Sequence, residues 1–103
     1  MELSDHQREV SRFIEDNNLG AAPGFRVLDL VSEVGELVQD VTKSSDYGLE
    51  PEKMDVKKDE VGDVLFSLLA VCNELDIDAE EALEEAVEKY ESRIEQKGEP
   101  GSE

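Results

Sequence analysis

Two short segments, EVGELV at residues 33–38 and EVGDVL at residues 60–65, decide how this 103-residue chain folds. In each segment an acid is followed three positions later by a second acid, with a glycine just before it. On an α-helix such a pair lies within about 60° on one face, one turn apart. Each pair can therefore close on one cation. A helical glycine costs about 1 kcal/mol relative to alanine, so a close helix contact or a ligand is expected at Gly35 and Gly62.

Apolar residues at helical spacing extend both segments into long helices. The first is predicted over about residues 25–42 and the second over about residues 55–75, where Asp55 is the expected N-terminal cap. The loop between them, residues 43–54, contains glycine and proline. The second of these helices is apolar nearly all round, which is typical of the most buried element of a fold.

Weaker periodic patterns predict one helix before this pair and one after it. The first begins near Ser4, a cap with Gln7 three positions on, and ends near Asn17. The last begins after Asp78, which forms a capping-box-like pattern with Glu81. Four helices joined by short loops predict an all-α, antiparallel four-helix bundle-like fold.

A single domain is expected over residues 1–103, because a chain of this length cannot supply two hydrophobic cores. Its core should span about residues 25–95, and residues 98–103 should form a frayed tail. Short helices in so small a chain leave apolar surface uncovered. We therefore expect self-association, as a homodimer or a dimer of dimers.

The acid pairs belong to a longer acidic stripe. With Glu33 as the reference, Asp29, Glu36 and Asp40 fall within about 60° of arc, and the apolar residues of that helix lie to one side. The helix that carries Glu60 repeats this arrangement in the same rotational sense. Antiparallel packing of the two apolar arcs would bring both acid pairs to one edge of the helix interface.

Four carboxylates that converge in this way, those of Glu33, Glu36, Glu60 and Asp63, repel one another unless a cation lies among them. All-oxygen ligands suit hard ions, so Mg²⁺, or alternatively Mn²⁺, is the predicted metal. In a chain with 28 acids this spacing also arises by chance, and we interpret the acid pairs within residues 81–88 as solvated surface. The shared glycine and the apolar flank distinguish the two pairs proposed as ligands.

The overall charge is strongly acidic, with 28 Asp and Glu against 10 Lys and Arg and a formal net charge of −18. This predicts a solvated, salt-adapted surface and argues against a nucleic-acid polymer as partner, because no basic patch could contact phosphates. The single cysteine, Cys72, excludes an intrachain disulfide. No apolar run reaches the roughly 20 residues of a membrane span, and no signal-peptide pattern is present, so a cytoplasmic protein without membrane association is expected.

The strings SEVGEL at residues 32–37 and DEVGDVLF at residues 59–66 resemble the MazG-like nucleotide pyrophosphohydrolases, an all-α superfamily that also includes dimeric dUTPases and phosphoribosyl-ATP pyrophosphatases. The family pattern is E-x-x-E, a loop and then E-x-x-D, and the similarity covers about residues 25–95. The resemblance implies Mg²⁺-dependent hydrolysis of a ribo- or deoxynucleoside triphosphate to the monophosphate and pyrophosphate. The implied metal ligands are Glu33, Glu36, Glu60 and Asp63.

The resemblance also implies roles for individual side chains. Glu33 or Glu36 could orient the attacking water as a general base instead of binding metal. Lys89 and Arg93 resemble a basic and aromatic stretch on the last helix of the family, which implies contact with the substrate phosphates. Ordinary surface charges paired with neighbouring glutamates are the alternative interpretation. Some relatives carry an asparagine where Val87 stands, so the nucleotide contacts of this helix depart from the family pattern.

Two other functions stay open at this point. A phosphoribosyl-ATP pyrophosphatase would cleave the same kind of bond, although the basic and aromatic residues expected for that larger substrate are not evident. A non-catalytic, metal-stabilised helical scaffold or regulator is the other. Redox di-iron chemistry is disfavoured, because neither acid pair includes a histidine and His6 is the single histidine of the chain.

We predict that folding and activity need high salt, because 18 net negative charges on one small domain repel one another until they are screened. At about 1 M salt the Debye length falls to about 3 Å. The melting temperature should therefore rise as KCl is increased from about 0.1 M to about 3 M. An unchanged melting temperature together with full activity at low ionic strength would contradict this prediction.

Overall fold

The computed structural model describes residues 1–101, and within them the chain is all helical. The predicted four-helix, all-α fold is confirmed, and no strand occurs among the described residues. Residues 102 and 103 of the predicted frayed tail lie outside the described residues. The elements are α1 (Leu3–Asp16), α2 (Phe25–Ser44), the short 3₁₀ helix η1 (Pro51–Lys53), α3 (Lys58–Glu74) and α4 (Ala79–Lys97).

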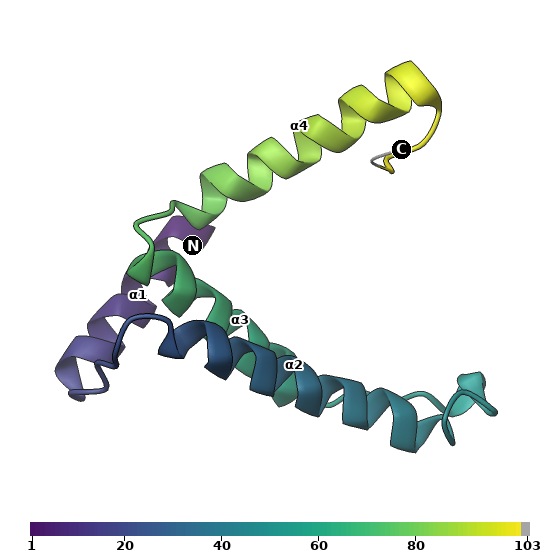
Figure 1. Ribbon diagram of the computed structural model, residues 1–103, viewed down its shortest axis with the longest axis horizontal. Coiled ribbons are helices and arrows are strands. Elements are labelled where there is room, and N and C mark those ends of the chain that lie inside the picture. The colour runs from purple at the N-terminus through teal and green to yellow at the C-terminus, as the bar shows by residue number, and fades with distance from the viewer. Residues whose placement is uncertain (102–103) are drawn as a thin grey trace.

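Helices α2 and α3 form an antiparallel hairpin that is crossed by α1 near the end where α2 begins and α3 finishes (Figure 1). The core lies at this crossing, where Val10, Leu69, Ala70 and Ala79 are buried. Phe66 packs against this core from α3. As expected, α3 contributes more buried residues than any other helix, whereas α2 has none.

The predicted N-terminal cap of α1 is wrong. This helix begins at Leu3, and Glu2 forms a capping box with Asp5, in which the Glu2 N–H donates to Asp5 Oδ2 over 2.9 Å. Ser4 therefore lies inside the first turn. A Glu–Asp pair at this spacing caps the helix in the same way as the expected Ser–Gln pair, because both pairs offer a side-chain oxygen to an unpaired backbone N–H.

The predicted cap of α3 is also wrong. Asp55 lies before the helix, where its N–H donates to Ser44 Oγ over 2.8 Å, and α3 begins at Lys58. The Ser44 hydroxyl also donates to the Asp40 carbonyl over 2.6 Å. These bonds hold the chain entering α3 against the last turn of α2, so the N-terminal cap position falls at Lys57, two residues later than expected. The cap predicted for α4 is confirmed, since Asp78 Oδ1 accepts from two N–H groups of the first turn.

The side chain of Gln7 joins α1 to the turn between α3 and α4. Its Nε2 donates to Asn73 Oδ1 over 3.1 Å and to the Ile77 carbonyl over 2.8 Å, and its Oε1 accepts from the Ala79 N–H over 2.9 Å. Asn73 Nδ2 donates back to the Gln7 carbonyl over 3.1 Å. Gln7 is 9% exposed, so its polar atoms depend on these partners.

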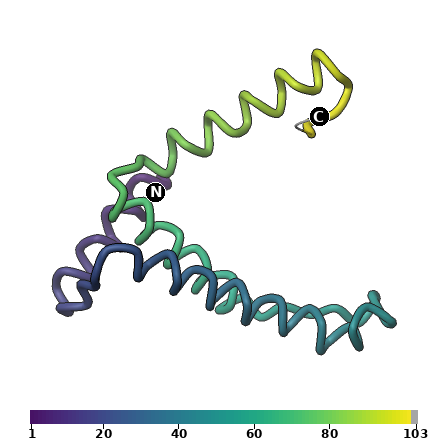
Figure 2. The backbone as a smooth tube through the Cα atoms, viewed as in Figure 1, coloured from purple at the N-terminus to yellow at the C-terminus, as the bar shows by residue number. Residues whose placement is uncertain are grey.

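From this junction α4 extends away from the hairpin as a separate arm (Figures 1 and 2). Ala79 at its start is buried, but most of the following residues of α4 are exposed. Its main contacts are with α1. No helix among the described residues is both long enough and apolar enough to cross a lipid bilayer.

We predict that replacing Gln7 by leucine destabilises the protein by about 2–3 kcal/mol, because the substitution leaves a buried N–H and a carbonyl at the α3–α4 turn without partners. Urea unfolding followed by circular dichroism would measure the loss. The exposed Gln39 on α2 is the matched control, and its replacement by leucine should change stability by less than about 0.5 kcal/mol. Equal stability of the two variants would refute the role given to Gln7.

Candidate metal centre

The acid pairs of α2 and α3 meet at one edge of the hairpin. Each of Glu33, Glu36, Glu60 and Asp63 offers one carboxylate oxygen, and the four oxygens lie within 4.8 Å of one another. Glu33 and Glu60 are partly buried, whereas Glu36 and Asp63 are exposed. The structure thus brings together the four residues that the sequence singled out.

A fifth acid, Asp40, stands beside this cluster, one helical turn beyond Glu36. Its Oδ2 accepts from the Lys57 N–H, at 3.4 Å, just before the first turn of α3. Asp40 falls in the acidic arc expected from the sequence, but no function was predicted for it. The signal that could have found it is its position four residues after Glu36, which puts it on the same face and next to the loop that returns to α3.

The cluster makes ionisation of Glu33 and Glu60 less favourable than it is for a glutamate in water. Partial removal from water raises the pKa of Glu33, and the negative charges of Glu36 and Asp63 raise it further. Removal from water also raises the pKa of Glu60, followed by the charges of Asp40 and Glu36. Both residues carry a cost of like-charge repulsion that a cation would relieve.

Two oxygen atoms of the cluster have no hydrogen-bond partner. Glu33 Oε2 and Glu60 Oε2 are buried side-chain atoms that no described donor reaches. Buried polar atoms are normally satisfied, so an unpaired carboxylate oxygen on each helix requires an explanation. All the donors are carboxylate oxygens, which suit Mg²⁺ or Mn²⁺ better than softer metals. The residues present therefore fit a hard divalent cation.

The expected reason for the two helix glycines is not found within the chain. An alanine Cβ at Gly35 or at Gly62 would meet nothing within 4 Å, so no neighbouring helix of the same chain approaches them closely. The contact expected at these glycines within the described fold is therefore absent.

Glu74 lies on the same arc of α3 as Glu60 and Asp63, but it does not join their cluster. Its Oε1 accepts a hydrogen bond from the Gly24 N–H over 2.6 Å at the start of α2.

The basic pair predicted to contact phosphate lies on the α4 arm. Lys89 Nζ is 5.1 Å and Arg93 Cζ is 6.0 Å from the centre of the Tyr90 ring, so both cations flank this aromatic side chain. Arg93 Nη1 also donates to the Pro100 carbonyl over 3.3 Å. Because α4 diverges from the hairpin, the structure does not bring this pair to the carboxylates of the same chain (Figure 1).

The fold and this cluster define a small all-α protein with a carboxylate centre on two antiparallel helices. The family model of the MazG nucleotide pyrophosphohydrolase domain matches residues 26–97. The chain belongs to this family. It is therefore a nucleotide pyrophosphohydrolase by family, and its acid cluster could hold the divalent metal on which such enzymes generally depend.

The chain is also similar to individual proteins. The uncharacterized protein YpjD of Bacillus subtilis strain 168 is 38% identical in an alignment of 96 residues, which covers 88% of this chain and 85% of that protein. A crystal structure of YPJD from Bacillus subtilis, provisionally described as a pyrophosphatase, matches with a TM-score of 0.73 and 36% identity. That match covers 90% of this chain and 96% of the other.

Replacing Glu60 by glutamine should have opposite effects with and without metal. Without metal, the variant should melt a few degrees higher than the wild type, because one of the mutually repelling charges is removed. With Mg²⁺ added, the rise in melting temperature expected for the wild type should be largely lost, because a ligand is missing. Differential scanning calorimetry in EDTA and in MgCl₂ would measure both effects.

The control is Glu88→Gln, which removes the same charge from an exposed position on α4. It should keep the full Mg²⁺-induced rise. If Glu60→Gln responds to Mg²⁺ as strongly as this control, the metal centre is wrong.

Proposed function

We propose that this protein hydrolyses a ribo- or deoxynucleoside triphosphate to the monophosphate and pyrophosphate with Mg²⁺, or alternatively Mn²⁺, held by Glu33, Glu36, Glu60 and Asp63. The observation that carries the proposal is the convergence of four carboxylate oxygens within 4.8 Å on two helices. Membership of a nucleotide pyrophosphohydrolase family supports the reaction class. The two unpartnered oxygens, one on each helix, support metal binding.

In the proposed mechanism the carboxylates of α2 and those of α3 have different roles. When bound, Mg²⁺ supplies charge neutralisation at the phosphates and lowers the pKa of a coordinated water. Glu60 and Asp63 on α3 are proposed as ligands. Glu33 and Glu36 on α2 are proposed as catalytic residues that share metal binding with acceptance of the proton of the attacking water.

Lys89 and Arg93 are proposed as substrate-binding residues for the phosphates. No ion pair with a neighbouring glutamate occupies either cation among the described residues, which supports this use over the surface-pair interpretation. Since α4 diverges from the hairpin of its own chain, such a contact requires the arm of another copy. We therefore propose that the active form is a homodimer or a dimer of dimers. We also propose that the protein acts in the cytoplasm.

The other candidate functions differ in what they would hydrolyse. A phosphoribosyl-ATP pyrophosphatase would use the same carboxylates on a larger substrate, and release of pyrophosphate from phosphoribosyl-ATP alone would favour it. A metal-stabilised scaffold would bind Mg²⁺ without hydrolysing any nucleotide. The metal centre is common to all three functions, so a substrate panel distinguishes them.

We predict pyrophosphate release from at least one nucleoside triphosphate, with Mg²⁺ at high salt, and a loss of about 100-fold or more in kcat for Glu36→Gln. The loss follows because the variant keeps the shape of the side chain but removes one charged oxygen from the centre. The measurement is pyrophosphate release from a panel of ribo- and deoxynucleoside triphosphates. Glu85→Gln, an exposed acid on α4, is the control and should retain wild-type activity.

Release of orthophosphate instead of pyrophosphate would refute the proposed bond cleavage. Absence of any release from the triphosphates and from phosphoribosyl-ATP would favour the scaffold. Equal activity of Glu36→Gln and the wild type would remove Glu36 from the site.

A further inference from the structure

The first turn of α3 needs acceptors for its backbone N–H groups, and its own N-cap residue does not supply one. That residue is Lys57, whose side chain makes no capping hydrogen bond. Glu60 is the third residue of the helix. In a capping box, the side chain at this position accepts from the N–H of the N-cap residue. The local arrangement of α3 therefore favours capping by Glu60, which is also one of the four acids of the metal centre.

Helix α1 shows, in the same chain, what an acid at this position does when nothing competes with it. The third residue of α1 is Asp5, and its Oδ2 accepts from the N–H of the N-cap residue Glu2 over 2.9 Å. Asp5 is thereby engaged by its own helix. A glutamate is typical of the same position. Glu60 is therefore expected to accept from the Lys57 N–H in the same way.

In α3 this N–H is bound by a residue of another helix. Asp40 Oδ2, on α2, accepts from the Lys57 N–H at 3.4 Å. Glu60 Oε2 is left buried and without a hydrogen-bond partner, in the cluster where the four acids converge. After partial removal from water, the charge of Asp40 is the strongest influence that raises the pKa of Glu60, so the two carboxylates are close neighbours. Asp40 thus occupies the donor that Glu60 is placed to reach.

The end of α2 holds Asp40 in this place. Ser44 Oγ donates to the Asp40 carbonyl over 2.6 Å and accepts from the Asp55 N–H over 2.8 Å. The segment that leads into α3 is therefore tied to the turn of α2 that carries Asp40. A negative charge is also favourable at the N-terminus of α3, where the helix dipole is positive.

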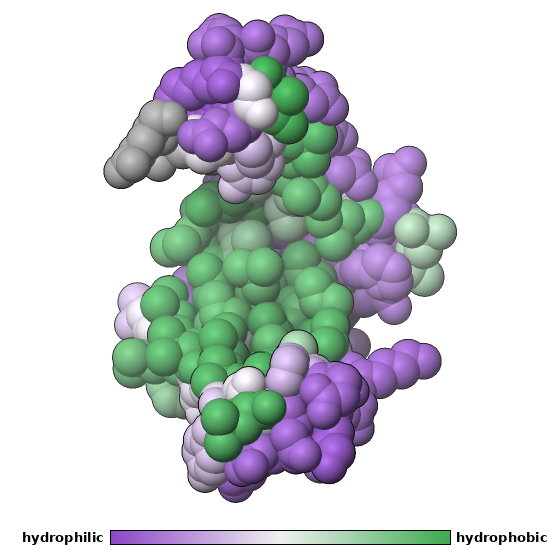
Figure 3. Space-filling view, turned by 90° about the vertical axis from the view of Figure 1, so that its right-hand side faces the viewer, coloured by the Kyte–Doolittle hydropathy of each residue, from purple (hydrophilic) through white to green (hydrophobic). Residues whose placement is uncertain are grey.

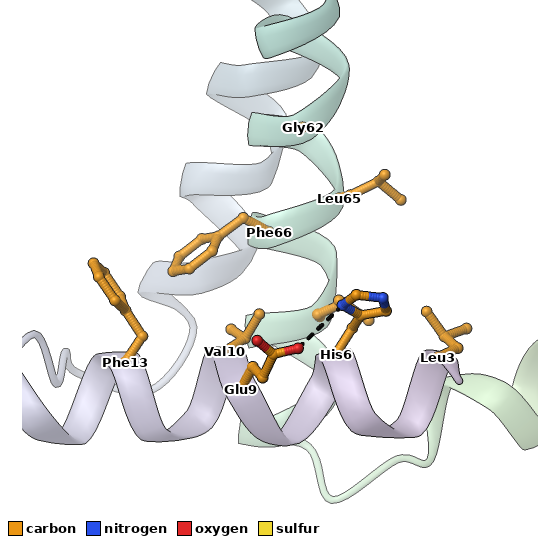
Figure 4. Close-up of a pocket in the computed structure, with 9 residues that line it drawn as sticks. Leu3, His6, Glu9, Val10, Phe13, Gly62, Leu65 and Phe66 are labelled. Atoms are coloured by element: carbon orange, nitrogen blue, oxygen red, sulfur yellow. Dashed lines mark ion pairs between the residues drawn. The ribbon is translucent and has the colours of Figure 1, made fainter. Parts of the chain in front are cut away.

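The contact between α3 and α1 lies away from Glu60. Phe66 packs edge-to-face against Phe13 of α1, with ring centres 5.8 Å apart, and Gly62 lies farther from α1 along the helix (Figure 4). Gly62 and Phe66 line an open groove of about 650 Å³. On the helical circle Gly62 is about 200° from Glu60, so this groove is on the other side of α3. Contact with α1 therefore positions the later turns of α3 and not the turn that carries Glu60.

Apolar side chains dominate the surface that the hairpin turns toward the α4 arm. Hydrophobic residues gather in the hollow between the arm and the hairpin, with hydrophilic residues at its two rims (Figure 3). Val61, which follows Glu60, and Leu65 are 45% and 51% exposed. Apolar side chains offer a carboxylate no hydrogen-bond donor. The polar contacts that decide where Glu60 points therefore come from α2.

We propose that Asp40 is a positioning residue of the metal centre: by accepting from the Lys57 N–H in place of Glu60, it keeps the Glu60 carboxylate free to bind the cation. This inference rests on the metal binding proposed above, and it adds a residue that is not one of the four ligands. Without Asp40, Glu60 caps its own helix and turns away from the acids of α2. The helix then keeps its cap, and the centre loses a ligand.

Differential scanning calorimetry in EDTA tests this exchange of caps without metal. In the wild type, Glu60→Ala should raise the melting temperature by a few degrees, because it relieves repulsion and removes no cap. In an Asp40→Ala background, Glu60→Ala should lower the melting temperature by about 4 °C or more, because Glu60 then caps α3. Asp59→Ala is the control, since it removes an exposed acid from the same turn, and it should have the same effect in both backgrounds. A shift of the same sign for Glu60→Ala in both backgrounds would overturn the proposal.

Binding of Mg²⁺ provides the second test. Asp40→Ala should need about 10- to 100-fold more Mg²⁺ than the wild type for the same rise in melting temperature. Adding Lys57→Pro should restore the requirement to within about 3-fold of the wild type, because proline removes the N–H for which the two carboxylates compete. The φ of Lys57 is −73°, which proline adopts. A double variant that binds Mg²⁺ as weakly as Asp40→Ala would show that Asp40 acts through its charge, and it would overturn the proposal.

Should the proline variant not fold, Asp40→Asn decides. Its amide oxygen can accept from the same N–H, so its Mg²⁺ requirement should stay within about 3-fold of the wild type. A requirement as high as that of Asp40→Ala would contradict the role given to the hydrogen bond.

These outcomes are separable from those of the catalytic proposal. The calorimetry in EDTA needs neither metal nor substrate, so equal shifts there would overturn the role of Asp40 and leave pyrophosphate release standing. A protein that shows the expected shifts and the expected Mg²⁺ response but releases no pyrophosphate would support the role of Asp40 and remove the proposed hydrolysis.

Discussion

The packing of α2 against α3 forces like charges together, and the rest of the site depends on this constraint. The two helices pack side by side in an antiparallel register that also brings both acid pairs to one edge, where four oxygens lie within 4.8 Å. Without a cation the hairpin bears this repulsion, which adds to partial removal from water in raising the pKa of Glu33 and of Glu60. Stability and function are therefore opposed at this edge, as is common at functional sites.

The α2–α3 hairpin carries acidic side chains on one face and apolar side chains on another. One face carries the acids, and the other carries valines and leucines that remain exposed in the single chain. The junction at Gln7 determines how this second face is presented, because its bonds to Ile77 and Ala79 hold the start of α4 against α1. The arm then leaves the hairpin, which creates the apolar opening. A change at Gln7 would therefore alter the direction of the arm without touching a carboxylate.

Periodicity was sufficient to predict the four helices and the convergence of the acids, because both follow from positions along single helices and from one antiparallel contact. It was not sufficient for the caps of α1 and α3, where Glu2 and the Ser44–Asp55 bond replaced the expected Ser4 and Asp55 caps. Nor could it predict the direction of α4. That direction depends on hydrogen bonds of Gln7 with residues 66 to 72 positions later, and a repeat pattern carries no information about such distant polar partners.

The net charge of −18 links the proposed chemistry to the proposed interface. A nucleoside triphosphate and a second copy are both repelled by such a surface at low ionic strength, over a Debye length of about 30 Å at 0.01 M. At about 1 M salt this length falls to about 3 Å, so the long-range repulsion is lost while contacts between partly buried groups are screened much less. Salt therefore weakens the long-range repulsion of the substrate and of a second copy. It weakens the proposed binding of a cation by Glu33 and Glu60 to a smaller extent. An acidic surface is compatible with an anionic substrate under these screened conditions, where the proposed cation and the proposed basic pair on α4 would act at short range.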